Sequence, residues 1–272
     1  MRVAIIGHTE WVTFARVPHA PAAGEIVHAS ESWEELAGGG GVAAAELARL
    51  AHAHGDSVMF FSAIGDDEVG ARVRSSLEAR ALDLQLATRR APHPRAVTLL
   101  DDDSERTITV LAPPLGCRGS DALDWSALDA CDALYFCKGD AAALREARRA
   151  RVLVATARVL DVIREAGVFV DVLVRSAHDA SELYAPGDLA PPPALVVSTE
   201  GAAGGSTITS TGEHGRWVAA PAPASIADTY GAGDTFAAAL TYALAAGCDL
   251  REALLFAGER GALALGRRGA GR

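Results

Sequence analysis

The sequence reads Asp228-Thr229-Tyr230-Gly231-Ala232-Gly233-Asp234-Thr235-Phe236 directly before an apolar segment that ends near residue 246. The spacing of the apolar residues predicts a helix over 232–246. Gly231 and Gly233 allow the backbone to turn tightly and to bring several N–H groups to one point, where the helix adds its positive N-terminal end. Such a place favours an anion, and a phosphoryl group in particular.

Asp234 is predicted to stand at the mouth of this helix. A carboxylate beside an anion site is useful when it takes a proton from an incoming hydroxyl while the N–H groups hold phosphoryl oxygens. The stretch therefore indicates phosphoryl transfer to a hydroxyl. The simpler interpretation is a turn in which Asp234 caps a helix. An isolated Gly-x-Gly-Asp-Thr would favour that interpretation, but the full nine-residue string 228–236 does not.

Short apolar runs that fit buried strands alternate with segments of helical spacing along most of the chain. The expected strands are 2–6, 57–64, 133–137, 152–155, 169–174 and 194–198, with two shorter ones near 206–209 and 216–218. The expected helices are 42–53, 69–81, a segment in the 140s, 158–166, 232–246 and 250–265. This order is typical of an α/β protein with a parallel sheet.

Two segments interrupt the alternation and predict a small β appendage. Residues 12–29 contain Pro18, Pro21 and Gly24, and residues 96–111 form a hairpin pattern around the acidic turn Asp101–Glu105. We find no internal repeat and no low-complexity linker. We therefore expect a single domain over residues 1–272.

The composition excludes several classes of protein. Half of the 272 residues are hydrophobic and the net charge is −10, which argues against nucleic-acid binding because that needs a basic face. No apolar stretch is long enough to cross a bilayer, the start does not resemble a secretory signal, and the four cysteines form no CxxC pair. We therefore expect a cytoplasmic protein with no nucleic-acid or membrane partner. The chain has no asparagine and one lysine, Lys138.

The string 228–236 and its Ala-rich helix resemble the C-terminal signature of the ribokinase-like (phosphofructokinase-B, PfkB) family of carbohydrate kinases. Other parts of the sequence resemble further family segments in the family's order: the run Gly38–Gly41, the segment Ile64–Gly70 and the loop Thr199–Gly204. The resemblance implies a three-layer α/β/α sandwich with a small β-sheet lid, whose strands come from about 12–30 and 96–111. It also implies a kinase that uses ATP and Mg²⁺ on a small sugar-like substrate.

The resemblance implies roles for the residues around the transfer site. Asp234 would be the general base, and the backbone of Gly231, Ala232 and Gly233 would form the anion hole. The substrate would approach the backbone at Gly38, Gly39 and Gly40.

On the nucleotide side, the resemblance implies that Thr199, Gly201 and Gly204 contact ATP. Asp228 would fall where many family members hold a monovalent cation such as K⁺. The lid of such proteins is often also the contact of a homodimer.

The acceptor side departs from the family pattern. Val12 stands where the family commonly has a sugar-binding Asp, so that the nearest carboxylate, Glu10, either replaces it or is merely exposed at a strand end. Residues 42–44 (Val-Ala-Ala) stand where an Asn is usual, and none of them can form a side-chain hydrogen bond. Arg106 either reaches an anionic group of the substrate or pairs with the acidic turn.

The metal motif is also altered. The family's NxxE segment aligns with Ser176-Ala177-His178-Asp179, so Asp179 keeps a carboxylate while the Asn is lost. Because Mg²⁺ takes oxygen ligands and retains waters, Asp179 is expected to serve as the metal-organising residue.

Parts of the sequence also fit two other functions. Gly39–Ala44 loosely matches a dinucleotide-binding GxGxxA loop, but the polar segment 30–36 before it does not suit a buried parallel strand. A kinase-fold protein that binds a nucleotide or another ligand without turnover is favoured by the missing sugar anchors and the altered metal motif. The intact 231–234 segment favours an active ATP-dependent phosphotransferase instead.

Overall fold

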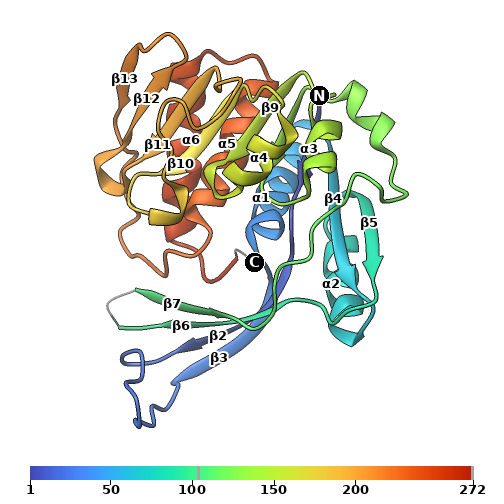
Figure 1. The fold of residues 1–272 in the computed structure, drawn as a ribbon. Helices are drawn as coiled ribbons and strands as arrows, with labels where there is room; N and C mark the ends of the chain where they lie inside the picture. The colour runs from blue at the N-terminus through green and yellow to red at the C-terminus, as the bar shows by residue number, and fades with distance from the viewer. Residues whose placement is uncertain (103–104, 271–272) are drawn as a thin grey trace.

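The computed structural model describes residues 1–102 and 105–270, and two sheets organise them (Figure 1). The strands of the large sheet are β1 (Arg2–Ile6), β4 (Ser57–Gly65), β5 (Asp83–Arg89), β8 (Ala133–Phe136), β9 (Val152–Thr156), β10 (Val172–Ser176), β11 (Leu195–Thr199), β12 (Gly205–Thr209) and β13 (His214–Trp217). Their order is β13-β12-β11-β10-β9-β8-β1-β4-β5. The strands from β5 to β11 are parallel, and β12 and β13 add an antiparallel edge.

Helices cover both faces of the large sheet. One face is packed by α1 (Gly39–His54), α2 (Glu68–Glu78), α5 (Ala232–Ala245) and α6 (Leu250–Leu265). The other is packed by the short 3₁₀ helix η1 (Trp125–Ala130), α3 (Ala141–Ala147) and α4 (Leu160–Ala166). Side chains alternate along β1, where Val3 and Ile5 join the first cluster and Ala4 and Ile6 the second. The predicted three-layer α/β/α architecture is confirmed.

The small sheet is built from β2 (Glu10–Arg16), β3 (Glu31–Ala37), β6 (Arg95–Leu100) and β7 (Arg106–Val110), in the order β3-β2-β6-β7. The prediction of lid strands within 12–30 is correct only for β2. The segment 17–30, which contains the two prolines and the glycine noted above, forms no strand, and the second strand, β3, begins after it at Glu31. The small sheet packs Val12, Phe14 and Leu100 against Val42 of α1 and Ala270. Of the acidic turn 101–105, residues 103 and 104 lie outside the described residues.

Three local expectations differ from the structure. The edge strand β5 was not anticipated, because its half-polar sequence DLQLATR lacks a continuous apolar run. Helix α1 begins at Gly39 rather than Val42, so the glycines form its first turn. Strand β10 begins at Val172 rather than Phe169, and Phe169 is exposed. No helix of the described segments is long and apolar enough to cross a membrane.

The parallel strands position the functional residues. In Figure 1 they run toward the small sheet, so their carboxyl ends face it. The loops after these strands and the start of α5 therefore meet in the region between the two sheets, where α/β proteins usually bind ligands.

Candidate active site

Asp234 lies in the first turn of α5, close to the start of α1. Its Oδ1 is 3.4 Å from the hydroxyl of Tyr135. Tyr135 lies in β8, the strand next to β1 in the large sheet. A Cβ atom built on Gly39 would lie 3.0 Å from the same oxygen. Burial raises the pKa of Asp234 above its ordinary value, while the positive charge of Arg158 and the Tyr135 hydroxyl oppose the rise. The carboxylate thus has the character of a base that can hold a proton.

The N-terminus of α5 presents backbone donors beside this carboxylate. Gly231 is the N-cap with φ +72°, and the first helical hydrogen bond runs from the N–H of Thr235 to the oxygen of Gly231 at 2.8 Å. The N–H groups of the preceding helical residues have no acceptor within a helix, and Gly233 is exposed. The interpretation of Asp234 as a helix cap is wrong, because Gly231 occupies the cap position. The predicted residues Gly231, Ala232 and Gly233 thus form the N-cap and the first two helical positions of α5.

Glu10 lies inside the molecule rather than exposed at a strand end. The residue is 6% exposed, and burial followed by the negative charge of Asp234 raises its pKa. Gly38, with φ +80°, packs on the backbone of Glu10 and donates its N–H to the Tyr230 hydroxyl at 3.3 Å. The structure therefore brings together Glu10, Gly38 and Asp234, which are far apart in the sequence.

The glycines at the start of α1 make this close packing possible. A Cβ atom on Gly40 would lie 2.6 Å from the carbonyl oxygen of His8, which no side chain could tolerate. The start of α1 thus rests directly on the end of β1, and this brings Gly39 within contact of Asp234.

Arg106, at the start of β7, connects the small sheet to the 228–236 segment. Its guanidinium donates to both the carbonyl oxygen and the hydroxyl oxygen of Thr229, at 2.7 and 2.6 Å. No ion pair with the described part of the acidic turn is formed. Phe14 of the small sheet contacts the same segment. Its ring packs edge-on against that of Tyr230, with 5.1 Å between the ring centroids.

The surroundings of Asp228 are those of a structural residue and not those of a cation ligand. It is fully buried, and its two oxygens accept hydrogen bonds from the N–H groups of Tyr230 at 2.7 Å and Gly269 at 2.6 Å. Because both oxygens face peptide donors, this carboxylate does not fit a monovalent cation. It ties Gly269 to the loop that precedes α5.

Asp179 belongs to an ionic cluster with Arg158 and Glu182. The Arg158 guanidinium donates to Glu182 Oε1 at 2.6 Å and to Asp179 Oδ2 at 3.0 Å. Ser181 donates twice to the other oxygen of Asp179, and these bonds hold the pKa of Asp179 below its ordinary value. Among the described residues no group of three or more metal-ligating side chains is found. Asp179 is nevertheless ionised and one-third exposed, which fits contact with a metal through water.

The predicted nucleotide-binding residues lie at the end of β11 and in the turn after it. Thr199 ends this strand, Gly201 opens the short helix η4 (Gly201–Ala203) with φ +60°, and Gly204 follows with φ +85°. A Cβ atom on Gly204 would lie 2.2 Å from the carbonyl oxygen of Trp217. Gly201 is exposed and Gly204 is buried, so the two glycines have different surroundings.

Sequence reasoning missed Tyr135, Arg158 and Glu182 as neighbours of Asp234. One signal was available for Arg158, since it follows the end of β9 by two positions, just as His8 follows β1 and Lys138 follows β8. Residues at equal offsets after adjacent parallel strands gather at one edge of the sheet.

Comparisons with known proteins show the family and the fold of the chain. The model of the family described as "pfkB family carbohydrate kinase" matches residues 1–272. The structure resembles a ribokinase from Thermotoga maritima, with a TM-score of 0.78, 20% identity and coverage of 98% of this chain and 94% of that chain. It resembles an adenosine kinase from Sinorhizobium meliloti with a TM-score of 0.79, 20% identity and coverage of 99% and 95%.

A ribokinase from Arabidopsis thaliana, solved with ribose and ATP, is also similar. Its TM-score is 0.72 at 16% identity, with coverage of 98% of this chain and 93% of that chain. No curated protein matches the sequence. The structural likenesses confirm the predicted ribokinase-like fold.

Proposed function

The chain belongs to the pfkB family of carbohydrate kinases, and on this premise we propose that it transfers the γ-phosphoryl group of ATP to a hydroxyl of a small sugar or sugar-like acceptor. The observation that carries the proposal is the position of Asp234. Its carboxylate, with a raised pKa, stands at the open N-terminus of α5 and beside Gly39.

Each of the two parts of this site has a role in the transfer. Asp234 removes the proton of the acceptor hydroxyl, which makes the oxygen a better nucleophile. The N–H groups of Ala232 and Gly233, with Gly231 shaping the turn, hold the phosphoryl oxygens on which charge is concentrated. Gly38, Gly39 and Gly40 let the acceptor approach the backbone, and Glu10 binds one of its hydroxyls.

We place ATP along the ends of β10 and β11, at Thr199, Gly201 and Gly204. Mg²⁺ bound with ATP would neutralise phosphate charge, and Asp179 would hold it through water. The small sheet would cover the acceptor as a lid, because Arg106 and Phe14 already connect it to the segment that carries Asp234.

The substitution Asp234→Asn tests the proposal. We expect kcat to fall by at least about a hundredfold, because a general base is lost, while the Kd for ATP stays within about twofold, because the N–H donors remain. The matched control is Asp249→Asn at the N-cap of α6, where Asn caps as well as Asp and activity should not change.

Two outcomes would contradict the proposal. Unchanged turnover in Asp234→Asn would exclude the assigned base. ATP binding without phosphorylation of any sugar or nucleoside by the wild-type protein would favour the non-catalytic alternative, and a ligand-dependent rise in Tm would then report the binding.

A further inference from the structure

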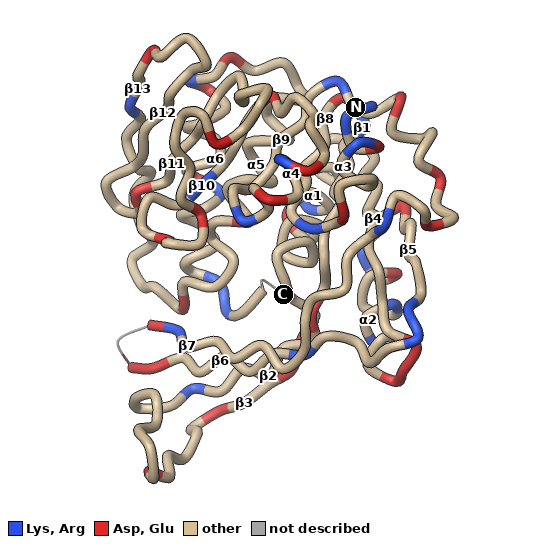
Figure 2. The backbone as a smooth tube through the Cα atoms, in the orientation of Figure 1, with Lys and Arg blue, Asp and Glu red and all other residues tan. Residues whose placement is uncertain are grey.

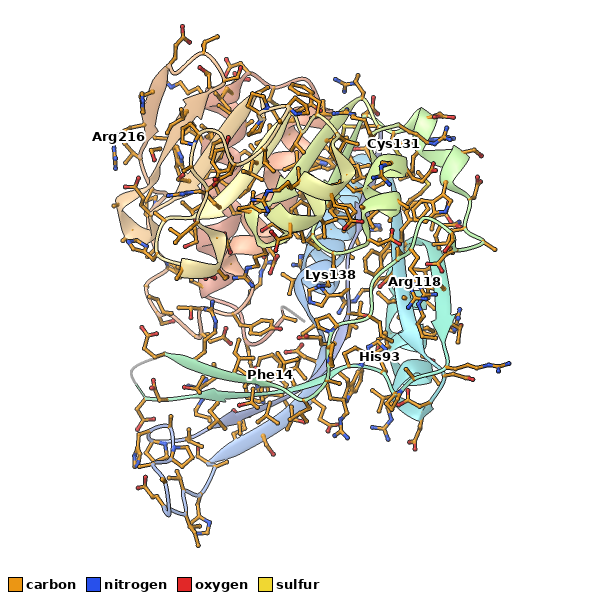
Figure 3. The ribbon with its side chains drawn as sticks, viewed as in Figure 1. Phe14, His93, Arg118, Cys131, Lys138 and Arg216 are labelled. Carbon is orange, nitrogen blue, oxygen red and sulfur yellow. The ribbon has the colours of Figure 1, made fainter. Side chains whose placement is uncertain are left out.

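Lys138 occupies a defined place at the edge of the site. It follows the end of β8 by two positions, and its N–H donates to the carbonyl oxygen of Ile6 in the neighbouring strand β1. The side chain is half-buried, with its Cγ close to Gly116. Figure 3 shows Lys138 at the end of the large sheet that is nearer the small sheet, which carries Phe14.

The ammonium group of Lys138 has no partner among the described residues. No carboxylate oxygen of these residues lies within 4.0 Å of it, and no hydrogen bond from it is formed within them. The neighbouring cations differ, because Arg158 is held by Glu182 and Asp179, and Arg106 by Thr229. The ammonium group of Lys138 is therefore available to contact a group outside the described residues.

The surroundings of Lys138 include His8, and Oε1 of the buried Glu10 lies 3.9 Å from Nε2 of His8. His8 follows β1 by two positions, and its pKa is lowered to about 4, by burial first and then by the positive charges of Lys138 and Arg158. The imidazole is therefore neutral at neutral pH, and its Nδ1 is buried without a partner. Figure 2 shows acidic and basic residues interspersed along the chain.

The acceptor side offers few groups for neutral hydroxyls. Val12 and the residues Val42, Ala43 and Ala44 are buried and apolar, and Val12 and Val42 belong to the apolar cluster under the small sheet. A site that fixes a neutral polyol needs several polar partners. One charge-assisted contact to an oxyanion is about as strong as two neutral hydrogen bonds, so an anionic acceptor needs fewer polar partners than a neutral one.

We propose that Lys138 binds a phosphate or carboxylate group of the acceptor, so that the substrate is an anionic hydroxyl compound rather than a neutral sugar. This inference rests on the proposed function and names its substrate class. Phosphate and carboxylate acceptors of this kind both carry an oxyanion at one end and a free hydroxyl that lies at Asp234.

Matched acceptors test the inference. The panel pairs glucose with glucose 6-phosphate and gluconate, fructose with fructose 6-phosphate, and ribose with ribose 5-phosphate. Binding of each compound is measured by calorimetry in the presence of a non-hydrolysable ATP analogue, which keeps the compounds out of the nucleotide phosphate site. Turnover is measured separately as ATP consumption.

We expect at least one anionic compound to bind at least tenfold more tightly than its neutral partner. Lys138→Met should remove at least tenfold of that affinity, Lys138→Arg should restore part of it, and the Kd for the ATP analogue should stay within twofold. The control Arg251→Met removes an exposed cation on α6 and should change nothing. Preference for a phosphate or for an acid identifies which oxyanion is bound.

The possible failures are distinguishable. If no compound of the panel binds in a Lys138-dependent way, or if neutral sugars bind as tightly as their anionic partners, the inference is wrong even where neutral sugars are phosphorylated. If anionic compounds bind through Lys138 and none is phosphorylated, the inference stands and the proposed function fails.

Discussion

Gly39 of α1 lies directly against the carboxylate of Asp234 in α5. A Cβ atom at position 39 would be 3.0 Å from Oδ1 and 3.4 Å from Cγ of Asp234. That distance is shorter than ordinary van der Waals contact, so any side chain there would displace the carboxylate by a few tenths of an ångström. The position of the proposed base is thus set by the absence of a side chain on the facing helix.

We therefore predict that Gly39→Ala lowers kcat by at least about tenfold, since small displacements of a reacting group are costly. The fold should tolerate the change, because alanine is about 1 kcal/mol more favourable than glycine in a helix. Steady-state kinetics and the Tm measure the two effects separately.

Gly41→Ala is the matched control in the same helix. A Cβ atom there would be 3.6 Å from the nearest atom, Thr9 Cγ2, which is an ordinary contact. This variant should keep kcat within about twofold. Equal losses of activity in both variants would show that α1 as a whole, and not the contact with Asp234, is sensitive.

Arg158 supplies a positive charge that favours the ionised form of Asp234, against the effect of burial. Removing this charge in Arg158→Met should raise the pKa of Asp234 further. Because the base must be deprotonated to act, the acidic limb of the kcat–pH profile should shift to higher pH, and the loss of activity should be larger at pH 5 than at pH 8.

The same substitution should lower the stability. It leaves Glu182, which is 6% exposed, without its guanidinium partner. We expect a cost of about 2 kcal/mol, between the values typical of exposed and of buried ion pairs, because Arg158 is itself largely exposed. Arg164→Met, which breaks an exposed pair with Asp161 on α4, is the control. An unchanged kcat–pH profile in Arg158→Met would show that Arg158 does not act on the ionisation of Asp234.

Glu10 is buried beside Asp234 and faces the start of α1 through the backbone of Gly38. We predict that Glu10→Ala raises the KM for the acceptor at least about tenfold, as expected for loss of a buried hydrogen-bonding partner, and leaves the KM for ATP within about twofold. Glu25→Ala, in the exposed segment between β2 and β3, should change neither. Equal effects of Glu10→Ala on both substrates would indicate a structural role.

The sequence predicted the elements that carry a strong local pattern. Helix α6 spans Leu250–Leu265 as expected, and the strands of the sheet centre lie within one to three residues of their predicted bounds. The turn before α5 was found from its glycines, because positive φ and free N–H groups are properties of a few adjacent residues.

The remainder depends on contacts between distant residues. Asp228 is bound by Gly269, 41 residues later, and Arg158 is bound by Glu182, 24 residues later. Neither partner is indicated by local spacing. The burial of Glu10 also could not be derived from the sequence, because it follows from the packing of Gly38 and Tyr230 around the start of β2.

Strand β7 forms one edge of the small sheet, and all five of its residues are exposed. Ile108 and Val110 are 42% and 49% exposed, and Leu111 beyond the strand is 57% exposed. An edge strand presents unpaired N–H and C=O groups, and an apolar edge of this kind favours pairing with another chain.

We propose that two copies of this chain associate through β7, and we predict that the wild-type protein is a dimer by size-exclusion chromatography with light scattering. Val110→Lys should raise the dimer Kd at least about tenfold, because it places a positive charge on the edge strand of each copy. The Tm of the dilute protein should change little, because the side chain is exposed in the single chain. Val218→Lys, at a position 79% exposed on the body, should leave the dimer intact. A monomeric wild-type protein, or a dimer that Val110→Lys does not weaken, would contradict this assignment.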